Sequence, residues 1–107
     1  METLTINKIG LQEFKQLIDF VDLSVIQEDL QSVRQATLFN SITLEKFDFY
    51  LSFDVEVVLV VRNDKVEILD ISINEVELWN EEEQMELSDR MIFELQKEVT
   101  KTIKNFI

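Results

Sequence analysis

FDFYLSFDVEVVLVV, residues 47–61, is the stretch of this chain that decides the fold. Every odd-numbered position in it is apolar, from Phe47 through Phe53 to Val61. Side chains of a strand alternate between its two faces, so this spacing predicts a strand with one face on a core. A helix would spread the same side chains around its whole axis. We therefore expect the fold to be organised around one long strand.

The even-numbered face of this strand changes character along its length. Its first part, from Asp48 to Glu56, is polar or amphipathic, whereas Val58 and Val60 are apolar. A strand that is apolar on both faces is usually covered on both. We expect a cover over Val58 and Val60, supplied either by a helix of the same chain or by a partner subunit.

Length and composition restrict the class of protein. The 107 residues predict a single domain, and a content of 46% hydrophobic and 30% charged residues is typical of a folded one. The 22 acids outnumber the 10 bases, which gives a net charge of −12. This charge opposes direct binding to nucleic acids and to anionic membranes, but it favours a protein partner with a basic surface.

Several catalytic and cofactor chemistries lack their residues here. The chain has no cysteine and no histidine, which removes thiolate zinc sites, histidine-ligated metals and any Ser-His-Asp triad. Proline is absent and Gly10 is the only glycine, so a phosphate-binding glycine loop is excluded. We expect no cofactor and no enzymatic activity. Neither a secretory signal nor a membrane-spanning run is visible, which predicts a cytoplasmic protein.

The residues before the central strand predict one short strand and two helices. Glu2 to Asn7 alternate weakly, which indicates a strand at a sheet edge. Apolar residues at helical spacing predict a helix over Leu11–Asp22 and a second one that begins near Ser24, its expected N-cap. Leu23 and Val25 would also suit a strand. Ser41–Lys46 is interpreted as a connector or as an extension of the central strand, and a strand could also begin at Thr37.

After the central strand the sequence predicts a meander and a final helix. Asn63-Asp64 suits a tight hairpin turn, and a change of face at Ile68-Leu69 indicates a bulge or burial on both faces. A second turn at Asn74-Glu75 would introduce a short strand, Val76–Trp79, followed by an acidic connector over residues 80–86. The last helix is expected from an N-cap at Ser88, with a stripe of Ile92, Leu95, Val99, Ile103 and Phe106.

These elements predict an α+β domain over residues 1–107. Its antiparallel sheet of three or four strands would be covered on one face by two or three helices, in the order β-α-(α)-β-β-β-α. The final helix is the expected cover for the part of the sheet that is apolar on both faces.

The interval between Lys65 and Arg90 contains nine acids and no base. One interpretation is an ordinary solvated surface. Another is an electronegative patch that docks on a basic protein groove and imitates the phosphates of a nucleic acid. A calcium loop is disfavoured because no glycine is present to make its sharp turn. The docking interpretation selects six residues: Glu75, Glu77, Glu81, Glu82, Glu83 and Glu86.

Two smaller groups of residues also allow a functional interpretation. Asp54 and Glu56 share a face, and Asp70 could approach them, so that carboxylate-based metal chemistry is a third hypothesis. Trp79 is expected either in the core, with its N–H bonded at the rim, or at an interface together with Val58 and Val60. The eight phenylalanines are expected mostly in the core.

Val55–Val99 resembles a pattern found in small uncharacterised bacteriophage proteins. In that pattern a Val- and Glu-rich strand precedes a second strand, a short turn and strand, an acidic stretch and a terminal helix. The present chain has Asn74-Glu75 where glycine is more usual. The resemblance implies a phage origin, hence the host cytoplasm as location, and transfers no site residue.

The leading functional hypothesis is a small, acidic, non-enzymatic protein that binds another protein, which for a phage protein means host interaction or inhibition. The alternative is a structural or assembly homo-oligomer that uses the apolar Val58 and Val60.

Overall fold

A computed structural model describes residues 9–32 and 36–107, and these form an α+β fold with an antiparallel sheet. The class and the antiparallel sheet were predicted, but the described elements follow the order α-α-β-β-β-β-α. The strand expected at Glu2–Asn7 lies outside the described residues. The elements are α1 (Leu11–Ile18), α2 (Ser24–Gln31), β1 (Thr37–Lys46), β2 (Phe49–Arg62), β3 (Lys65–Asn80), β4 (Glu83–Met85) and α3 (Asp89–Lys104).

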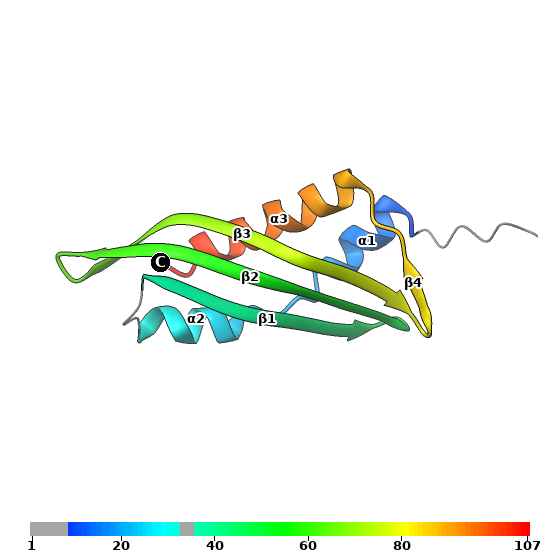
Figure 1. Ribbon diagram of the computed structural model, residues 1–107, viewed down its shortest axis with the longest axis horizontal. Helices are drawn as coiled ribbons and strands as arrows, with labels where there is room; N and C mark the ends of the chain where they lie inside the picture. Colours follow the sequence, from blue (N-terminus) through cyan, green and yellow to red (C-terminus); the bar gives the residue numbers. More distant parts are fainter. Residues whose placement is uncertain (1–8, 33–35) are drawn as a thin grey trace, which may run out of the picture.

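The four strands form a meander in the order β1-β2-β3-β4 (Figure 1). The turn at Asn63-Asp64 is confirmed, and both residues have the positive φ of a two-residue hairpin turn. A second turn of this kind uses Phe47 and Asp48, at φ 53° and 66°, so Phe47 is not the first residue of the central strand. The Phe47 ring instead packs edge-on against Phe20, with 5.5 Å between the ring centroids.

β3 is one continuous strand, so the turn predicted at Asn74-Glu75 is wrong. Asn74 pairs with Asp54 and Glu77 with Ser52, which places two residues of β3 opposite the single Phe53. Glu75 absorbs the extra residue as a bulge, with a φ of 55°. The bulge predicted at Ile68-Leu69 is confirmed by a second register shift opposite Val58 and Leu59.

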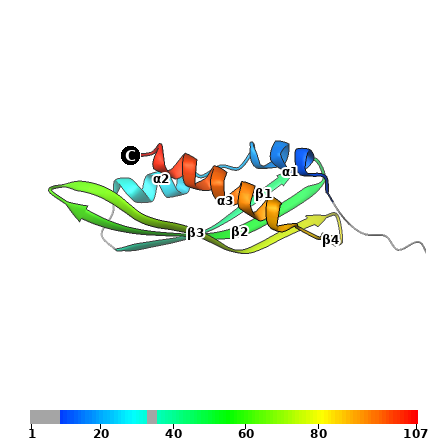
Figure 2. The same ribbon diagram turned by 90° about the horizontal axis from the view of Figure 1, so that it is seen from above.

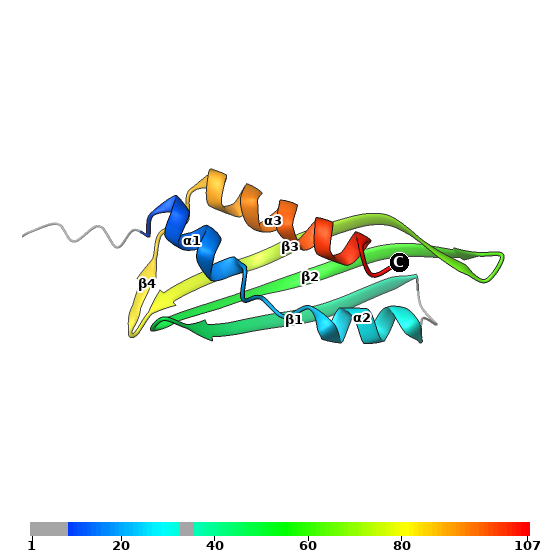
Figure 3. The ribbon, with the colours of Figure 1, turned by 180° about the vertical axis from the view of Figure 1, so that it is seen from behind.

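All three described helices lie on the same face of the sheet, as Figures 2 and 3 show. The odd-numbered side chains of β2 face these helices, and Phe53, Val55 and Val57 are fully buried there. The prediction that the final helix covers Val58 and Val60 is wrong, because α3 packs on the opposite face. Val58 and Val60 are half-buried on the face that none of the described helices covers, and the odd-numbered Val61 is 51% exposed.

The helices are shorter than their periodicity suggested. α1 ends at Ile18 rather than at Asp22, and α2 begins at Ser24 without using its hydroxyl as an N-cap. The carboxylate of Asp22 accepts a hydrogen bond from the Ser24 backbone N–H at 2.9 Å instead. At the other end of the chain the N-cap is confirmed, because Ser88 Oγ accepts from the Met91 N–H at 3.2 Å.

The bond at the start of α2 makes a prediction about pH. The backbone N–H and the hydroxyl of Ser24 hold the pKa of Asp22 below its usual range. A lowered folded-state pKa stabilises the fold above the ordinary aspartate pKa of about 3.9, and the effect is lost as the pH falls through the folded value. We expect carboxyl NMR titration to give Asp22 a lower pKa in the native chain than in the same chain unfolded in urea. Equal values would contradict the assigned hydrogen bond.

α3 also closes part of the edge of the sheet. The Gln96 side chain donates to the Ile71 backbone oxygen at 2.8 Å and accepts from the Ile73 N–H at 3.1 Å. Its amide group further donates to Thr100 Oγ1 at 3.0 Å, which holds it in this orientation. Gln96 thus takes the place of a neighbouring strand beside the central part of β3.

Candidate functional site

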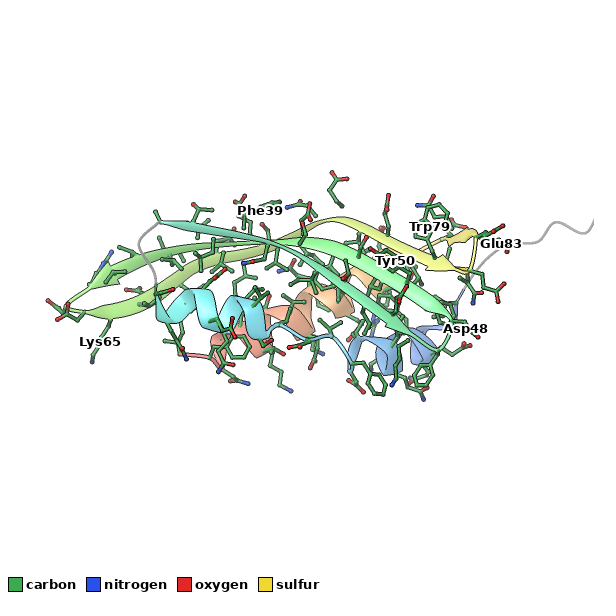
Figure 4. All side chains as sticks on the ribbon, turned by 90° about the horizontal axis from the view of Figure 1, so that it is seen from below. Phe39, Asp48, Tyr50, Lys65, Trp79 and Glu83 are labelled. Carbon is green, nitrogen blue, oxygen red and sulfur yellow. The ribbon has the colours of Figure 1, made fainter. Side chains whose placement is uncertain are left out.

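The face of the sheet that no described helix covers, here called the outer face, is the candidate functional surface. Its members follow from the register, because residues that alternate with the buried ones share this face. Figure 4 shows Phe39 and Trp79 on this side, away from the helices. The outer face consists of Thr37, Phe39, Ser41, Thr43 and Glu45 in β1, Tyr50, Ser52, Asp54, Glu56, Val58, Val60 and Arg62 in β2, Lys65, Glu67, Asp70, Ser72, Asn74, Glu77 and Trp79 in β3, and Gln84 in β4.

Acidic side chains dominate the outer face. Among the described strands its two bases, Arg62 and Lys65, form one cross-strand pair beside the β2–β3 turn. Elsewhere on this face the described strands place no base, and they carry the six acids Glu45, Asp54, Glu56, Glu67, Asp70 and Glu77. Like charges on neighbouring strands raise the local negative potential, which attracts cationic groups from solution.

Hydroxyl and aromatic groups lie between these acids. Ser41 Oγ donates to Asp54 Oδ1 at 2.7 Å across the β1–β2 pair. Tyr50 pairs with Trp79 across β2 and β3 at the end of the sheet near the β1–β2 turn. Phe39, on the outer face of β1 opposite Glu56, is 59% exposed. The outer face therefore offers both carboxylates and uncovered aromatic rings to a partner.

The six acids predicted as a docking patch do not share one face. All six side chains are exposed, but only Glu77 belongs to the outer face. Glu75 occupies the bulge, while Glu81 and Glu82 form the β3–β4 turn. Glu83 pairs with Asn80, which lies on the same side of β3 as the buried Leu78, so Glu83 belongs to the face opposite the outer face. Glu86 follows the end of β4.

The residues predicted at an interface are on one face but at opposite ends of it. Val58 and Val60 lie toward the β2–β3 turn, whereas Trp79 pairs with Tyr50 toward the β1–β2 turn. Trp79 lies on the outer face, so the prediction that it packs in the core is wrong. The phenylalanines were also expected mostly in the core, but only Phe14 and Phe53 are buried.

The carboxylates considered for metal chemistry share the outer face without converging on one point. Asp54 pairs with Asn74 and Glu56 with Ser72, while Asp70 lies opposite Val58. Within residues 9–32 and 36–107 no cluster of three or more potential ligand side chains is placed to hold a metal ion.

Sequence reasoning did not assign Glu45 and Glu67 to a binding surface, and it assigned Asp54, Glu56 and Asp70 to a different chemistry. Asp54 and Glu56 could have been assigned to this surface, because the even-numbered positions of the first part of β2 are polar. Glu45 needed the β1–β2 register, because the sequence left residues 41–46 as a connector or extension. Acids from three strands combine only after the sheet has formed.

Known proteins add no information about this surface. Neither the family models nor the curated proteins nor the solved structures give a match to the chain. Among the described helices, none combines the length and the apolar composition that a membrane crossing requires.

Proposed function

We propose that this chain is a non-enzymatic protein that acts by binding another protein, and that the acidic outer face is its contact surface. The observation that carries the proposal is the extent of this face, where six acids lie on three strands beyond the single Arg62–Lys65 pair. No described helix covers it. A basic surface on the partner would complement this charge, and the attraction would weaken as salt rises.

The similarity to small bacteriophage proteins suggests the biological setting. In a bacterial host, a protein that presents rows of carboxylates could occupy a basic groove that otherwise holds nucleic acid. Host interaction or inhibition in the cytoplasm is therefore the form of partner binding that we propose.

The test compares two triply neutralised variants that differ only in the face they affect. Glu56→Gln, Asp70→Asn and Glu77→Gln together remove three of the six acids of the outer face. The control neutralises Glu13 in α1, Asp19 directly after α1 and Glu28 in α2. Each variant and the native chain would be immobilised and exposed to a bacterial lysate at 50 and 200 mM salt. We expect the native chain and the control to capture the same protein at low salt. The outer-face variant should capture about tenfold less of that protein.

Mass spectrometry would identify the retained protein. Equal capture by both triple variants would show that the total charge acts rather than the outer face, and would overturn the proposal. Capture by the native chain that is unchanged between the two salt concentrations would contradict a contact based on charge.

A homo-oligomer is the second candidate, and one observation favours it. Val58 and Val60 are half-buried neighbours on the outer face, where they form a small apolar patch. Burial of such a patch against a second copy would remove apolar surface from water. Light scattering separates the two candidates. A dimer that persists at high salt would favour the homo-oligomer, whereas a monomer would favour binding of a different protein.

A further inference from the structure

The two edges of the sheet are treated differently by the fold. Along β3, Gln96 occupies the outward groups of Ile71 and Ile73, and β4 pairs with residues 78–80. Along β1, the Ala36 carbonyl oxygen accepts from the Leu59 N–H at 2.9 Å, which fixes the phase of the β1–β2 ladder. Hydrogen-bonding direction alternates along a strand, so even-numbered β1 residues bond to β2 and odd-numbered ones point outward.

The outward backbone groups of β1 form a continuous row along this edge of the sheet. They belong to Thr37, Phe39, Ser41, Thr43 and Glu45, and no described residue forms a backbone hydrogen bond with them. Uncapped edges of this length are uncommon in proteins that do not use them, because they accept additional strands. The edge from Thr37 to Leu44 carries no charged side chain, so it imposes no electrostatic barrier of its own.

We propose that the outward edge of β1, which pairs with no described residue, binds an extended, basic peptide segment of the partner, which adds to the sheet as a fifth strand. The inference rests on the proposed function and specifies how the partner is recognised. Backbone hydrogen bonds to β1 would supply affinity, and the side chains on the outer face would select lysine and arginine.

The charge next to the edge selects a basic occupant over a second copy of the chain. Asp54 and Glu56 lie on β2, about 10 Å or two strand spacings from an added strand, and Glu45 lies at the end of β1. A lysine or arginine opposite Phe39 would extend over its 59%-exposed ring toward Glu56. A second copy would instead bring together two chains that each carry a net charge of −12.

The geometry of strand addition provides a matched pair of peptides as probes. A residue that pairs with Phe39 through hydrogen bonds has its side chain on the outer face and its N–H directed at β1. In a ten-residue synthetic peptide of alternating lysine and threonine, the lysine amides would therefore face the edge. N-methylation of the lysine amides blocks pairing, whereas N-methylation of the threonine amides leaves it intact, at equal charge.

We expect the lysine-methylated peptide to bind the native chain about tenfold more weakly than the threonine-methylated one at low salt. On the protein side, Thr43→Pro removes an outward N–H without removing a ladder bond, and Thr43→Ala retains it. We expect Thr43→Pro to weaken binding by a similar factor relative to Thr43→Ala. Hydrogen exchange at the Phe39 and Ser41 amides should slow on binding. If Thr43→Pro does not fold, the two peptides still decide the question.

Three results would overturn the inference. Equal affinity of the two methylated peptides would show that charge alone holds them, and would leave the proposed function intact. Protection of the Phe39 and Ser41 amides in the free chain would show that the edge is already occupied, by a second copy if protection rises with concentration and by the chain itself if it does not. Absence of peptide binding, while outer-face capture succeeds, would reject strand addition alone.

Discussion

Phe53→Ala is expected to reduce the free energy of unfolding by about 3–5 kcal/mol, the usual cost of truncating a buried phenylalanine. Phe53 is 1% exposed at the centre of β2, between the sheet and the helices. Its removal leaves a cavity that neighbouring side chains fill only in part, so packing contacts are lost in addition to the transfer free energy. For a domain of this size such a loss is a large part of the total stability.

The control is Phe39→Ala on the neighbouring strand. Phe39 belongs to the opposite face of the sheet and is 59% exposed, so we expect a change of less than about 1 kcal/mol. Urea unfolding of both variants at constant m-value would measure the difference. Comparable losses in the two variants would contradict a sheet with one buried and one open face, and with it the basis of the outer-face proposal.

Gln96→Ala is expected to cost about 2 kcal/mol, from two hydrogen bonds of about 1 kcal/mol each. The substitution leaves the Ile73 N–H and the Ile71 carbonyl oxygen, at present bonded to Gln96, without this partner. A matched control is Gln16→Ala on α1, which replaces an exposed glutamine with the same gain in helix propensity. The difference between the two variants in urea unfolding therefore reports the edge contact.

Hydrogen exchange at single amides tests the Gln96→Ala prediction locally. We expect the Ile73 amide to exchange faster in Gln96→Ala and to remain unchanged in Gln16→Ala. The uncapped edge of β3 should also make the variant more prone to self-association, since unpaired strand edges recruit other strands. An Ile73 amide that remains protected in Gln96→Ala would show that another group bonds it.

The central strand could be predicted from sequence because its alternation is strict and its inward residues are large. The sequence around β1 was less informative, since Asn40 interrupts its inward row and Phe39 places an apolar ring on the open face. Its strand state depends on pairing with β2. The false turn at Asn74-Glu75 has a related cause. β2 is 14 residues long, so β3 forms more ladder hydrogen bonds by absorbing a bulge at Glu75 and continuing to pair with β2 than by reversing direction there.

The candidate surface was less predictable than the fold. A search along the sequence found the densest run of acids, at residues 75–86, but the fold divides that run among a bulge, a turn and a short strand. The acids that share the outer face are distant in sequence, such as Glu45 and Glu77, and only the register of three strands brings them together. The sequence also did not determine which face of β2 the final helix covers near Val58 and Val60. Both faces are apolar there, and periodicity does not choose between them.

The hairpin meander also has a consequence for how quickly the chain reaches its native state. β1, β2 and β3 are consecutive and are joined by two-residue turns, so most pairings between them can form by zippering outward from residues 47–48 and 63–64. Such local closure costs little chain entropy and favours rapid folding. The sequence contains no proline, so no slow prolyl isomerisation can delay a fraction of the molecules. Renaturation from urea should therefore lack the phase of tens of seconds that prolyl bonds impose.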